Sequence, residues 1–342
     1  MFWKFTHNPH AEITPIYTAE KDTVAMKIQQ VMRDFWVVVA TAVVAIFFMV
    51  PRESSAQFVG VQYGPRAFSN APKGTNALDL KVDFMDMGID LDGRLLQGLD
   101  NSSKALYLSY TRYFGLFGKT ASVLFALPFV EIETELETPR GTFPGLSASG
   151  LTDPFLQFNI GLVGNESMDP QEFFTTEPGF GMTLHTGMRV PIGEYDADLP
   201  LNPGANRFEF RFGFPMTYTW GTPTQQTSLE LSPIFYFFED NDSPFGAARV
   251  SQNEALQIEA HVVHDFLPAF WGALNALRVW GGETETDGVR GDNALKYTSI
   301  GASLGGRLSR KLSYSFHYGF RFDSKDEADD GSLIRGGLTL TF

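Results

Sequence analysis

The sequence predicts an all-β fold, a transmembrane antiparallel up-and-down β-barrel of about 12 strands with an N-terminal signal helix. Three observations predict it. The apolar residues fall mainly at every second position, which is the period of a β-strand. Phe is unusually frequent, at 32 of 342 residues, and the chain ends on Phe342. The mean hydropathy of −0.10 fits as well, because strands that alternate lipid-facing and lumen-facing side chains average out near zero.

Twelve segments from Asn76 onward carry this alternation. In the clearest, 208–220, five Phe and Tyr residues, Met216 and Trp220 share one face, while Glu209 and Arg211 share the other. A helix, with its period of 3.6 residues, cannot make such a stripe. The alternative is a soluble β-sandwich or propeller, which would have to cover the Phe-rich faces with a second layer. The predicted strands are 76–90, 104–114, 121–133, 155–164, 181–190, 208–220, 227–238, 254–265, 272–283, 297–308, 312–322 and 333–342.

The connections between these segments fall into two lengths. An even number of strands returns the C-terminus to the side on which the first strand begins, as a bacterial single-chain barrel requires. With a periplasmic start, short periplasmic turns alternate with longer outer loops. The predicted turns are 115–120, 221–226 and 309–311, and the predicted outer loops are 136–152, 191–207 and 239–253.

The N-terminal sequence predicts an export signal. Residues 35–50 form a long apolar run after Lys27 and Arg33, too short for a span of about 20 residues and typical of a signal h-region. Small residues follow, so we expect cleavage between Ala56 and Gln57. The domains are then a signal peptide at 1–56, with a true start at Met26 as one interpretation, an irregular segment at 57–75 in the periplasm or the barrel mouth, and the barrel at 76–342. A retained N-terminal anchor is the alternative.

The composition excludes several function classes. With no cysteine in the chain, disulfide scaffolds and thiolate metal sites are excluded. The formal net charge of −14 offers no basic patch for nucleic acid. This charge predicts either acidic surface loops, including the acidic residues at 239–242, or a cation-selective pore. We expect no metal, no cofactor and no nucleic-acid partner.

The last strand carries an assembly signal. Phe342, Leu340 and Leu338 share one face at the end of the chain. This arrangement resembles the terminal signal by which a barrel pairs with the strand edge of the barrel assembly machinery. The expected partners are therefore this machinery, the lipid and lipopolysaccharide of the outer membrane, and small organic solutes.

Short blocks of sequence resemble the meta-pathway phenol degradation family. They are SGLTDP at 149–154, VPIGEYD at 190–196 and NPGANR at 202–207, with 65–66, 70–74 and 127–129 in support. The resemblance implies an outer-membrane barrel that passes small, often aromatic, organic compounds. A structural interpretation of the motif is equally open, because Gly150 permits unusual backbone angles and Asp153 before Pro154 favours a turn.

The polar faces of the predicted strands supply candidate lumen residues. These side chains form either a charge-paired network that holds the wall together or a polar constriction that selects solutes. The candidates are Gln157, Asn159, His185, Arg189, Glu209, Arg211, Glu230, Glu259, His261, His317 and Arg321. Gln257 lies on the same face of its strand as Glu259.

We therefore expect a barrel in the cell outer membrane that passes small solutes, including hydrophobic or aromatic ones, by passive diffusion. One alternative is a structural barrel without an open pore. The other is an outer-membrane lipid hydrolase, but no Ser, His and orienting residue stand at a recognisable spacing, and we expect no enzyme activity. His261 and His264 point to opposite faces of a strand, which does not suit a metal.

Overall fold

The computed structural model describes residues 62–342, except 92–93, 139–140, 223 and 322–330. The predicted signal peptide, its cleavage site at Ala56 and Gln57, and Met26 lie outside the described residues, as do residues 57–61. No helix in the described ranges is long and apolar enough to cross a membrane.

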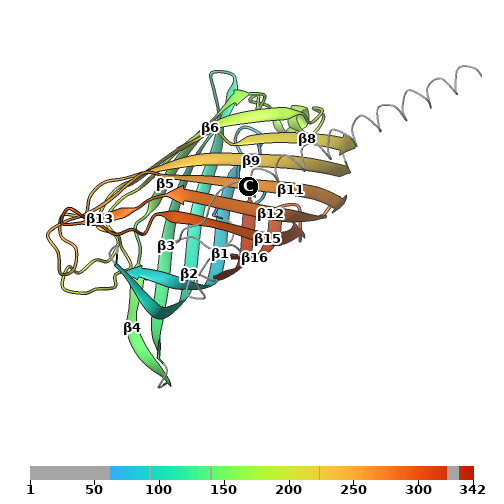
Figure 1. The fold of residues 1–342 in the computed structure, drawn as a ribbon. Helices are drawn as coiled ribbons and strands as arrows, with labels where there is room; N and C mark the ends of the chain where they lie inside the picture. Colours follow the sequence, from blue (N-terminus) through green and yellow to red (C-terminus); the bar gives the residue numbers. More distant parts are fainter. Residues whose placement is uncertain (1–61, 92–93, 139–140, 223, 322–330) are drawn as a thin grey trace, which may run out of the picture. The chain divides into compact units, whose positions relative to one another are not determined.

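The described strands form one closed antiparallel wall (Figure 1). The main sheet has 14 strands, and β4 with β5 and β7 with β8 each form one interrupted wall strand, so the wall has 14 − 2 = 12 strands. This confirms the predicted fold class. The wall strands are β1 (Asn76–Leu91), β2 (Arg94–Leu116), β3 (Lys119–Thr138), β4 (Gly141–Leu151), β5 (Phe155–Val163), β6 (Phe180–Arg189), β7 (Glu209–Gly213), β8 (Met216–Thr222), β9 (Gln225–Phe238), β11 (Ala255–Leu267), β12 (Phe270–Gly281), β15 (Leu295–Arg307), β16 (Leu312–Arg321) and β17 (Ser332–Thr341).

The first and last strands close the wall. β1 pairs with β17 in a continuous register from Ala77 opposite Thr341 to Asp86 opposite Ser332. Just beyond it, Asn76 and Phe342 exchange two backbone hydrogen bonds of 2.9 Å each. The wall therefore has no open edge at its seam, which a bilayer requires because an unpaired backbone group there costs several kcal/mol.

Three predicted turns are confirmed. Residues 117–118 connect β2 with β3, residues 308–311 connect β15 with β16, and β8 pairs directly with the following strand β9; these connections lie at one end of the barrel. A longer connection on this side, 164–179, agrees with the gap between the predicted strands 155–164 and 181–190, and it contains the short helix α2 (Pro170–Phe173), which was not predicted. It packs on the turn beside it through the Ser167 N–H, which donates to the Gly118 carbonyl at 2.9 Å.

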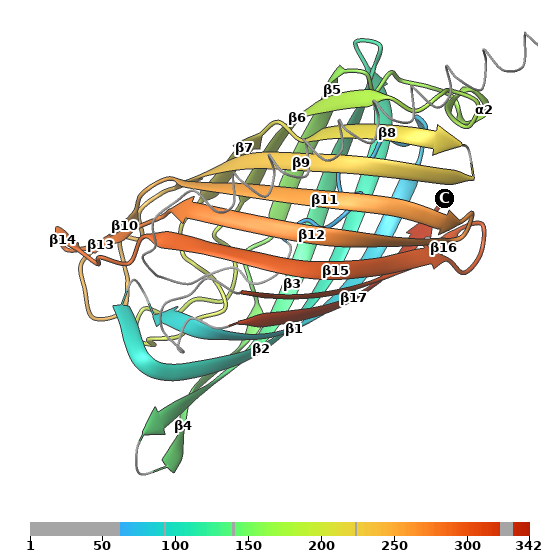
Figure 2. The ribbon, with the colours of Figure 1, turned by 45° about the vertical axis from the view of Figure 1, so that its right-hand side comes forward.

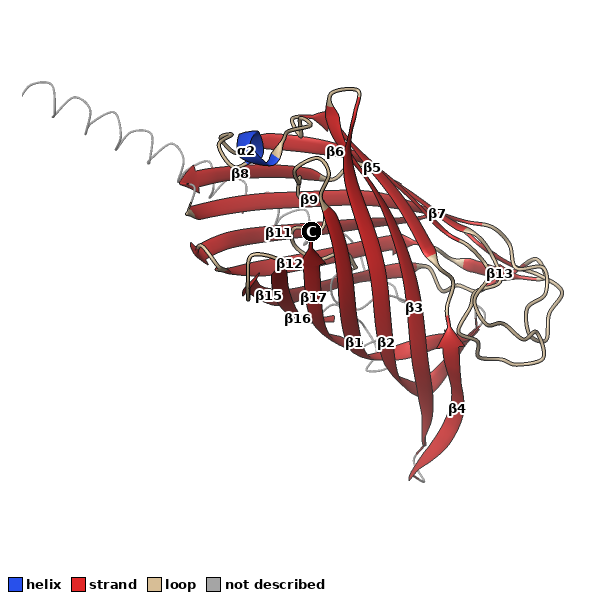
Figure 3. Ribbon diagram, turned by 180° about the vertical axis from the view of Figure 1, so that it is seen from behind, coloured by secondary structure: helices blue, strands red, loops and turns tan. Residues whose placement is uncertain are grey.

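The predicted outer loop 136–152 is wrong, because residues 136–138 and 141–151 continue the sheet. β3 runs to Thr138 and β4 returns beside it, and β2 begins ten residues before its predicted start (Figure 3). β2 has 23 residues, about twice the 9–11 that a tilted strand needs to cross a bilayer. Beyond the hydrocarbon no lipid constrains alternate side chains, so the apolar alternation fades while the pairing continues.

The other long connections lie at the same end as β4 (Figure 2). Residues 190–208 contain no strand, as predicted. The predicted loop 239–253 contains β10 (Val250–Gln252), which joins β13 (Thr284–Thr286) and β14 (Val289–Arg290) in a separate three-stranded sheet. This small sheet lies beyond the ends of the wall strands β11 and β12 (Figure 2).

The distribution of apolar and charged side chains on the two faces of the wall is the reverse of that in a soluble protein. Leu80 is 42% exposed and Leu338 is 44% exposed on the outside, whereas Asp83 on the inner face is fully buried. Outward-facing Leu, Phe and Tyr side chains continue this surface around the barrel. Because an outer surface so rich in exposed apolar side chains is stable in hydrocarbon rather than in water, the wall is built to span a membrane.

Candidate lumenal site

A chain of polar side chains crosses four neighbouring strands on the inner face of the wall. His261 Nδ1 lies 3.0 Å from Asn275 Oδ1, and Asn275 Nδ2 donates to Ser303 Oγ at 2.6 Å. Ser303 Oγ in turn lies 2.7 Å from His317 Nδ1. All four side chains are buried. The chain links β11, β12, β15 and β16 at one level of the barrel.

An ion pair continues this level across the seam. Arg335 on β17 donates from Nε and Nη2 to the two carboxylate oxygens of Asp83 on β1, at 2.7 and 2.6 Å. Both side chains are at least nine-tenths buried. This is the bidentate geometry that makes Arg–carboxylate pairs strong and directional.

The opposite wall carries a second polar chain. Asn159 on β5 donates to Ser122 Oγ on β3 at 3.2 Å and lies 2.8 Å from His185 Nδ1 on β6. On β7, Arg211 Nε donates to Glu209 at 2.6 Å. We call these two chains, the ion pair, and the buried carboxylates Glu230 on β9 and Glu259 on β11 the lumenal girdle. Its members are Ser122, Asn159, His185, Glu209, Arg211, Glu230, Glu259, His261, Asn275, Ser303, His317, Arg335 and Asp83.

Residues 62–75, the inner segment, pass inside the barrel and bind the girdle. The carboxylate of Glu259 accepts the backbone N–H groups of Gln62, Tyr63 and Gly64, the last two at 3.0 and 3.1 Å. Glu259 Oε2 also lies 3.3 Å from His261 Nε2. One buried carboxylate therefore fixes three successive amides of a segment that belongs to no sheet.

Arg66 holds the inner segment further toward the turn side. Its backbone N–H donates to Glu230 at 2.8 Å, and its guanidinium pairs with Asp265 at 2.7 Å. The same guanidinium lies 5.2 Å from the ring centroid of Trp271, a cation–π distance. Arg66 thus ties the segment to β9, β11 and β12.

Gly64 lies where no other residue fits without strain. Its φ is +85°, and a Cβ at this position would come within 3.2 Å of His317 Cε1. The carbonyl of Gln62, two residues earlier, accepts from Arg335 Nη1 at 3.1 Å. The segment therefore passes directly over the His317 and Arg335 side of the girdle.

Tyr63 contacts the opposite side of the lumenal girdle, on β6 and β7. Its hydroxyl lies 3.1 Å from His185 Nε2 and accepts from Arg211 Nη1 at 3.1 Å. Burial raises the pKa of the Tyr63 hydroxyl above its usual value of 10.0, so it stays protonated at neutral pH and can donate to His185. The Phe68 ring packs against both Tyr63 and His185, with centroids 5.0 and 5.2 Å away.

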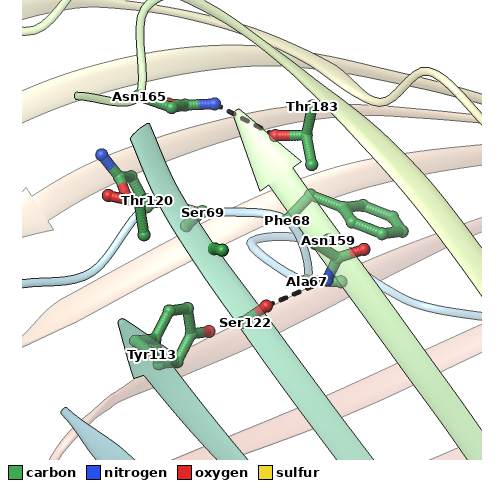
Figure 4. A pocket seen from close by; sticks show the side chains of 11 residues that line it. Ala67, Phe68, Ser69, Tyr113, Thr120, Ser122, Asn159, Asn165 and Thr183 are labelled. Carbon is green, nitrogen blue, oxygen red and sulfur yellow. Dashed lines mark hydrogen bonds between the residues drawn. The ribbon is translucent and has the colours of Figure 1, made fainter. Parts of the chain in front are cut away.

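A small cavity remains beside the inner segment (Figure 4). It lies between Phe68 of the segment and the inner faces of β2, β3, β5 and β6. Its free space of about 20 Å³ holds little more than one water molecule. The lining is uncharged and consists of Ala67, Phe68, Ser69, Asn70, Tyr113, Thr120, Ala121, Ser122, Asn159, Asn165 and Thr183.

The motif blocks at 149–154, 190–196 and 202–207 meet at the interruption between β4 and β5. The buried carboxylate of Asp153 accepts the N–H groups of Gly193 and Ala205 at 2.9 and 2.8 Å, which joins the three blocks. A Cβ on Gly193 would lie 2.7 Å from the Asp153 backbone nitrogen. Glu194 accepts the Leu151 N–H at 3.0 Å. These contacts support the structural interpretation of the motif.

The predicted lumen residues have their side chains inside the wall. Arg321 lies apart from the girdle, with its guanidinium 4.2 Å from the ring centroid of Tyr297. The predicted assembly residues Phe342, Leu340 and Leu338 are exposed on the outside. The role of the first set in lining the pore and the role of the second set in assembly both stay predictions. The buried residues are Gln157, His185, Arg211, Glu230, Glu259, His261, His317 and Arg321, and the half-buried ones are Asn159, Arg189 and Glu209.

Sequence reasoning missed several members of the site. Asp83 and Arg335 stand on the polar faces of their predicted strands, but their pairing depends on the register at the seam. Asn275 and Ser303 lie in strands with weak alternation. Tyr63 and Arg66 belong to the inner segment, which has no periodicity that could place it.

Two hydroxyl–histidine pairs bear on the hydrolase alternative. Ser303 and His317 lie 2.7 Å apart in the lumen, and Thr227 Oγ1 lies 2.9 Å from His264 Nδ1. Within the ranges that the structure describes, neither His317 nor His264 forms a hydrogen bond or an ion pair with a carboxylate that could orient it. The same ranges contain no group of three His, Cys, Asp or Glu residues that could hold a metal ion.

The closed wall, the apolar exterior and the partly filled polar lumen define a membrane-spanning β-barrel. The family model described as "Putative MetA-pathway of phenol degradation" matches residues 92–329, and the chain belongs to this family. The match confirms the resemblance that the motif blocks carry. Among curated proteins, none matches the chain.

Two solved structures that resemble this chain have little sequence in common with it. The COG4313 outer membrane channel from Pseudomonas putida F1 is 16% identical, with a TM-score of 0.63 over 85% of this chain and 100% of that one. The transport unit of the autotransporter AIDA-I from Escherichia coli is 11% identical, with a TM-score of 0.45 over 80% of this chain and 92% of that one. The first of these likenesses supports the fold.

Proposed function

We propose that the protein is an outer-membrane channel through which small organic solutes, including hydrophobic or aromatic ones, diffuse passively. One observation carries the proposal. The inner segment lies inside the barrel but belongs to no strand of its wall, and contacts with side chains of the lumenal girdle hold it there. A barrel that served only as a scaffold would have no need of a separable segment across its lumen.

The comparisons with known proteins support a role as a channel. The Pseudomonas putida structure is titled an outer membrane channel, and the family description refers to phenol degradation. The outer membrane is also the compartment in which bacterial barrels of this architecture serve.

The proposed partners follow from the outer surface and from the last strand. The exposed Leu, Phe and Tyr side chains on the outer face support contact with membrane lipid. The acidic residues at 239–242 support contact with lipopolysaccharide through divalent ions. Phe342, Leu340 and Leu338 support recognition by the barrel assembly machinery, because they are exposed and end the strand that closes the wall.

In this proposal the lumenal girdle has two roles. It fixes the wall strands to one another, and it forms the polar constriction that solutes meet once the inner segment moves. Gln157, Arg189 and Arg321 extend the polar lining beyond the girdle. The roles are compatible because a constriction residue that is fully paired keeps a fixed position.

Conductance and solute flux test the proposal. The purified mature protein is reconstituted in planar bilayers and in liposomes, together with a deletion of residues 62–72 and with Glu259→Gln. We expect flux of small solutes in the wild type and a severalfold higher conductance in both variants, because Gln holds the three amides more weakly than a carboxylate. Glu131→Gln, on the exposed side of β3, is the matched control and should match the wild type.

The two alternatives have their own readouts. A sealed wild-type barrel that stays sealed without residues 62–72 would support the structural alternative and contradict the proposal. Release of fatty acid from phospholipid vesicles that is lost in Ser303→Ala or His264→Ala would support the hydrolase.

A further inference from the structure

Two arginines share one carboxylate on the wall of β6 and β7. Glu209 Oε1 lies 2.6 Å from Arg211 Nε and 3.5 Å from Arg189 Nε. Two guanidinium groups and one carboxylate leave a local charge of +2 − 1 = +1. No other carboxylate forms an ion pair with either arginine in the part of the chain that the structure describes.

Both arginines keep donors without an acceptor. Arg211 Nη2 and Arg189 Nε are buried and form no hydrogen bond; the 3.5 Å approach of Arg189 Nε to Glu209 is an ion pair only. The Arg211 side chain is 2% exposed, so water does not freely satisfy Nη2. A buried donor on a charged group is costly to leave unpaired, which points to an acceptor that enters from the lumen.

Aromatic rings cover the guanidinium of Arg211. The centroids of Phe155, Tyr236 and Tyr63 lie 4.4, 4.9 and 5.8 Å from its central carbon. An oxygen acceptor must therefore approach in the plane of the guanidinium, along its N–H edges. A carboxylate binds arginine in this way, with one oxygen on each of two nitrogens.

The inner segment already places an aromatic ring and one oxygen at this position. Tyr63 directs its hydroxyl to Arg211 Nη1 and His185 Nε2, and its ring makes an edge contact with His185 at 5.4 Å. One oxygen satisfies Nη1 and leaves Nη2 without a partner. Tyr63 thus occupies the place of a ligand that carries a ring and two oxygens.

We infer that Arg211, with Arg189, Phe155 and Tyr236, forms a binding site for the carboxylate of a small aromatic acid, and that Tyr63 competes for this site. The inference names a solute class for the proposed channel and to that extent rests on the proposed function. The ligand's oxygens take Nη1 and Nη2 of Arg211, and its ring takes the place of the Tyr63 ring. Binding then removes one of the contacts that hold the inner segment.

Equilibrium dialysis of the detergent-solubilised, full-length mature protein tests the site directly. The probes are benzoate, its neutral isostere benzamide, and phenol. We expect benzoate to bind at least about tenfold more tightly than benzamide or phenol, because only benzoate offers two charged oxygens to one guanidinium. Equal binding of benzamide would overturn the inference, and so would equal binding of phenol, which offers one oxygen.

Two variants separate the site from general folding. Arg211→Lys should weaken benzoate binding about tenfold, because an ammonium group cannot bind both oxygens in one plane. Arg307→Lys, at the rim of the wall, should bind benzoate like the wild type. Tyr63→Phe keeps the ring but removes the competing hydroxyl, and we expect it to tighten benzoate binding about threefold. Unchanged or weaker binding in Tyr63→Phe contradicts the inference even if Arg211→Lys fails to fold.

The site and the channel fail in different ways. Benzoate binding without flux in liposomes would overturn the proposed channel and keep the site. Flux of small solutes without benzoate binding would keep the channel and overturn the site.

Discussion

Arg335 and Asp83 join the two ends of the barrel sequence through a buried pair of hydrogen bonds of 2.7 and 2.6 Å. Their strands lie about 250 residues apart in the chain and are neighbours only because the wall closes. The pair therefore stabilises the step that turns a sheet into a barrel. Arg335 also donates to the Gln62 carbonyl, so the seam and the inner segment share one guanidinium.

Breaking this pair should destabilise the closed wall. Asp83→Ala leaves the Arg335 guanidinium buried without its partner, and we expect a loss of about 3–5 kcal/mol in the free energy of unfolding. Urea unfolding in lipid vesicles, followed by Trp fluorescence, measures it. The double variant Asp83→Leu with Arg335→Met should recover most of the loss, because it buries no charge. A single variant as stable as the wild type would contradict the role of the pair.

Gly64 should be required for the position of the inner segment. In Gly64→Ala the new methyl group meets the His317 ring at about 3.2 Å and occupies a backbone conformation with φ of +85°. We expect the segment to shift and the single-channel conductance to rise.

Gly74→Ala is the matched control, because its φ is +88° but nothing lies within 4 Å of the added Cβ. Both variants carry the same type of backbone strain, about 1–3 kcal/mol, and differ in the contact with His317. Equal conductance of the two variants would show that this contact does not set the position of the segment.

Much of the wall could be predicted because a bilayer imposes its own period on the sequence. The stripe at 208–220 predicted one strand, and the structure divides it into β7 and β8 around Phe214 and Pro215, since proline has no N–H to donate to the neighbouring strand. The extended outer ends of β2, β3 and β4 were missed because the apolar alternation ends where the hydrocarbon ends.

The candidate site could be predicted only in part. His185, Arg211 and Glu259 follow from the phase of their strands. Their partners do not: Tyr63 comes from a segment without periodicity, and the hydrogen bond between Ser303 and His317 depends on cross-strand register. The charge of −14 suggested a cation-selective pore as one interpretation, whereas the wall around Glu209 has a local excess of positive charge.

Asp153 should hold the long connection 190–208 against the wall. Asp153→Ala removes the acceptor of two backbone N–H groups, and we expect a loss of about 1–3 kcal/mol, with faster protease cleavage within this connection. Limited proteolysis of the protein in vesicles measures the rate. Asp198→Ala, in the same connection and exposed, is the control and should be cleaved like the wild type. Equal rates in the two variants would contradict the role of Asp153.

A charge on the lipid-facing surface should interfere with insertion. Leu80 lies on the outer face of β1 and is 42% exposed. Leu80→Arg places a cation there, and we expect a cost of up to about 2–4 kcal/mol in the free energy of folding into vesicles. Ala77→Arg tests a lumen-side position near the end of the same strand and should fold more readily than Leu80→Arg. The fraction of protein with heat-dependent gel mobility measures folding, and equal folding of the two variants would contradict the assignment of the faces.

Fluorescence quenching at single cysteines tests the alternation of the two faces most directly, because the chain has no native cysteine. Labels are attached to cysteines that replace Leu80, Phe125 and Leu338 on the outer face, and Ser303 and Ser109 on the inner face. We predict that lipids carrying a quencher in their acyl chains quench the first three labels and spare the last two. Equal lipid quenching of both sets, or strong quenching of the outer labels by aqueous iodide alone, would contradict a barrel with hydrocarbon outside and a polar lumen within.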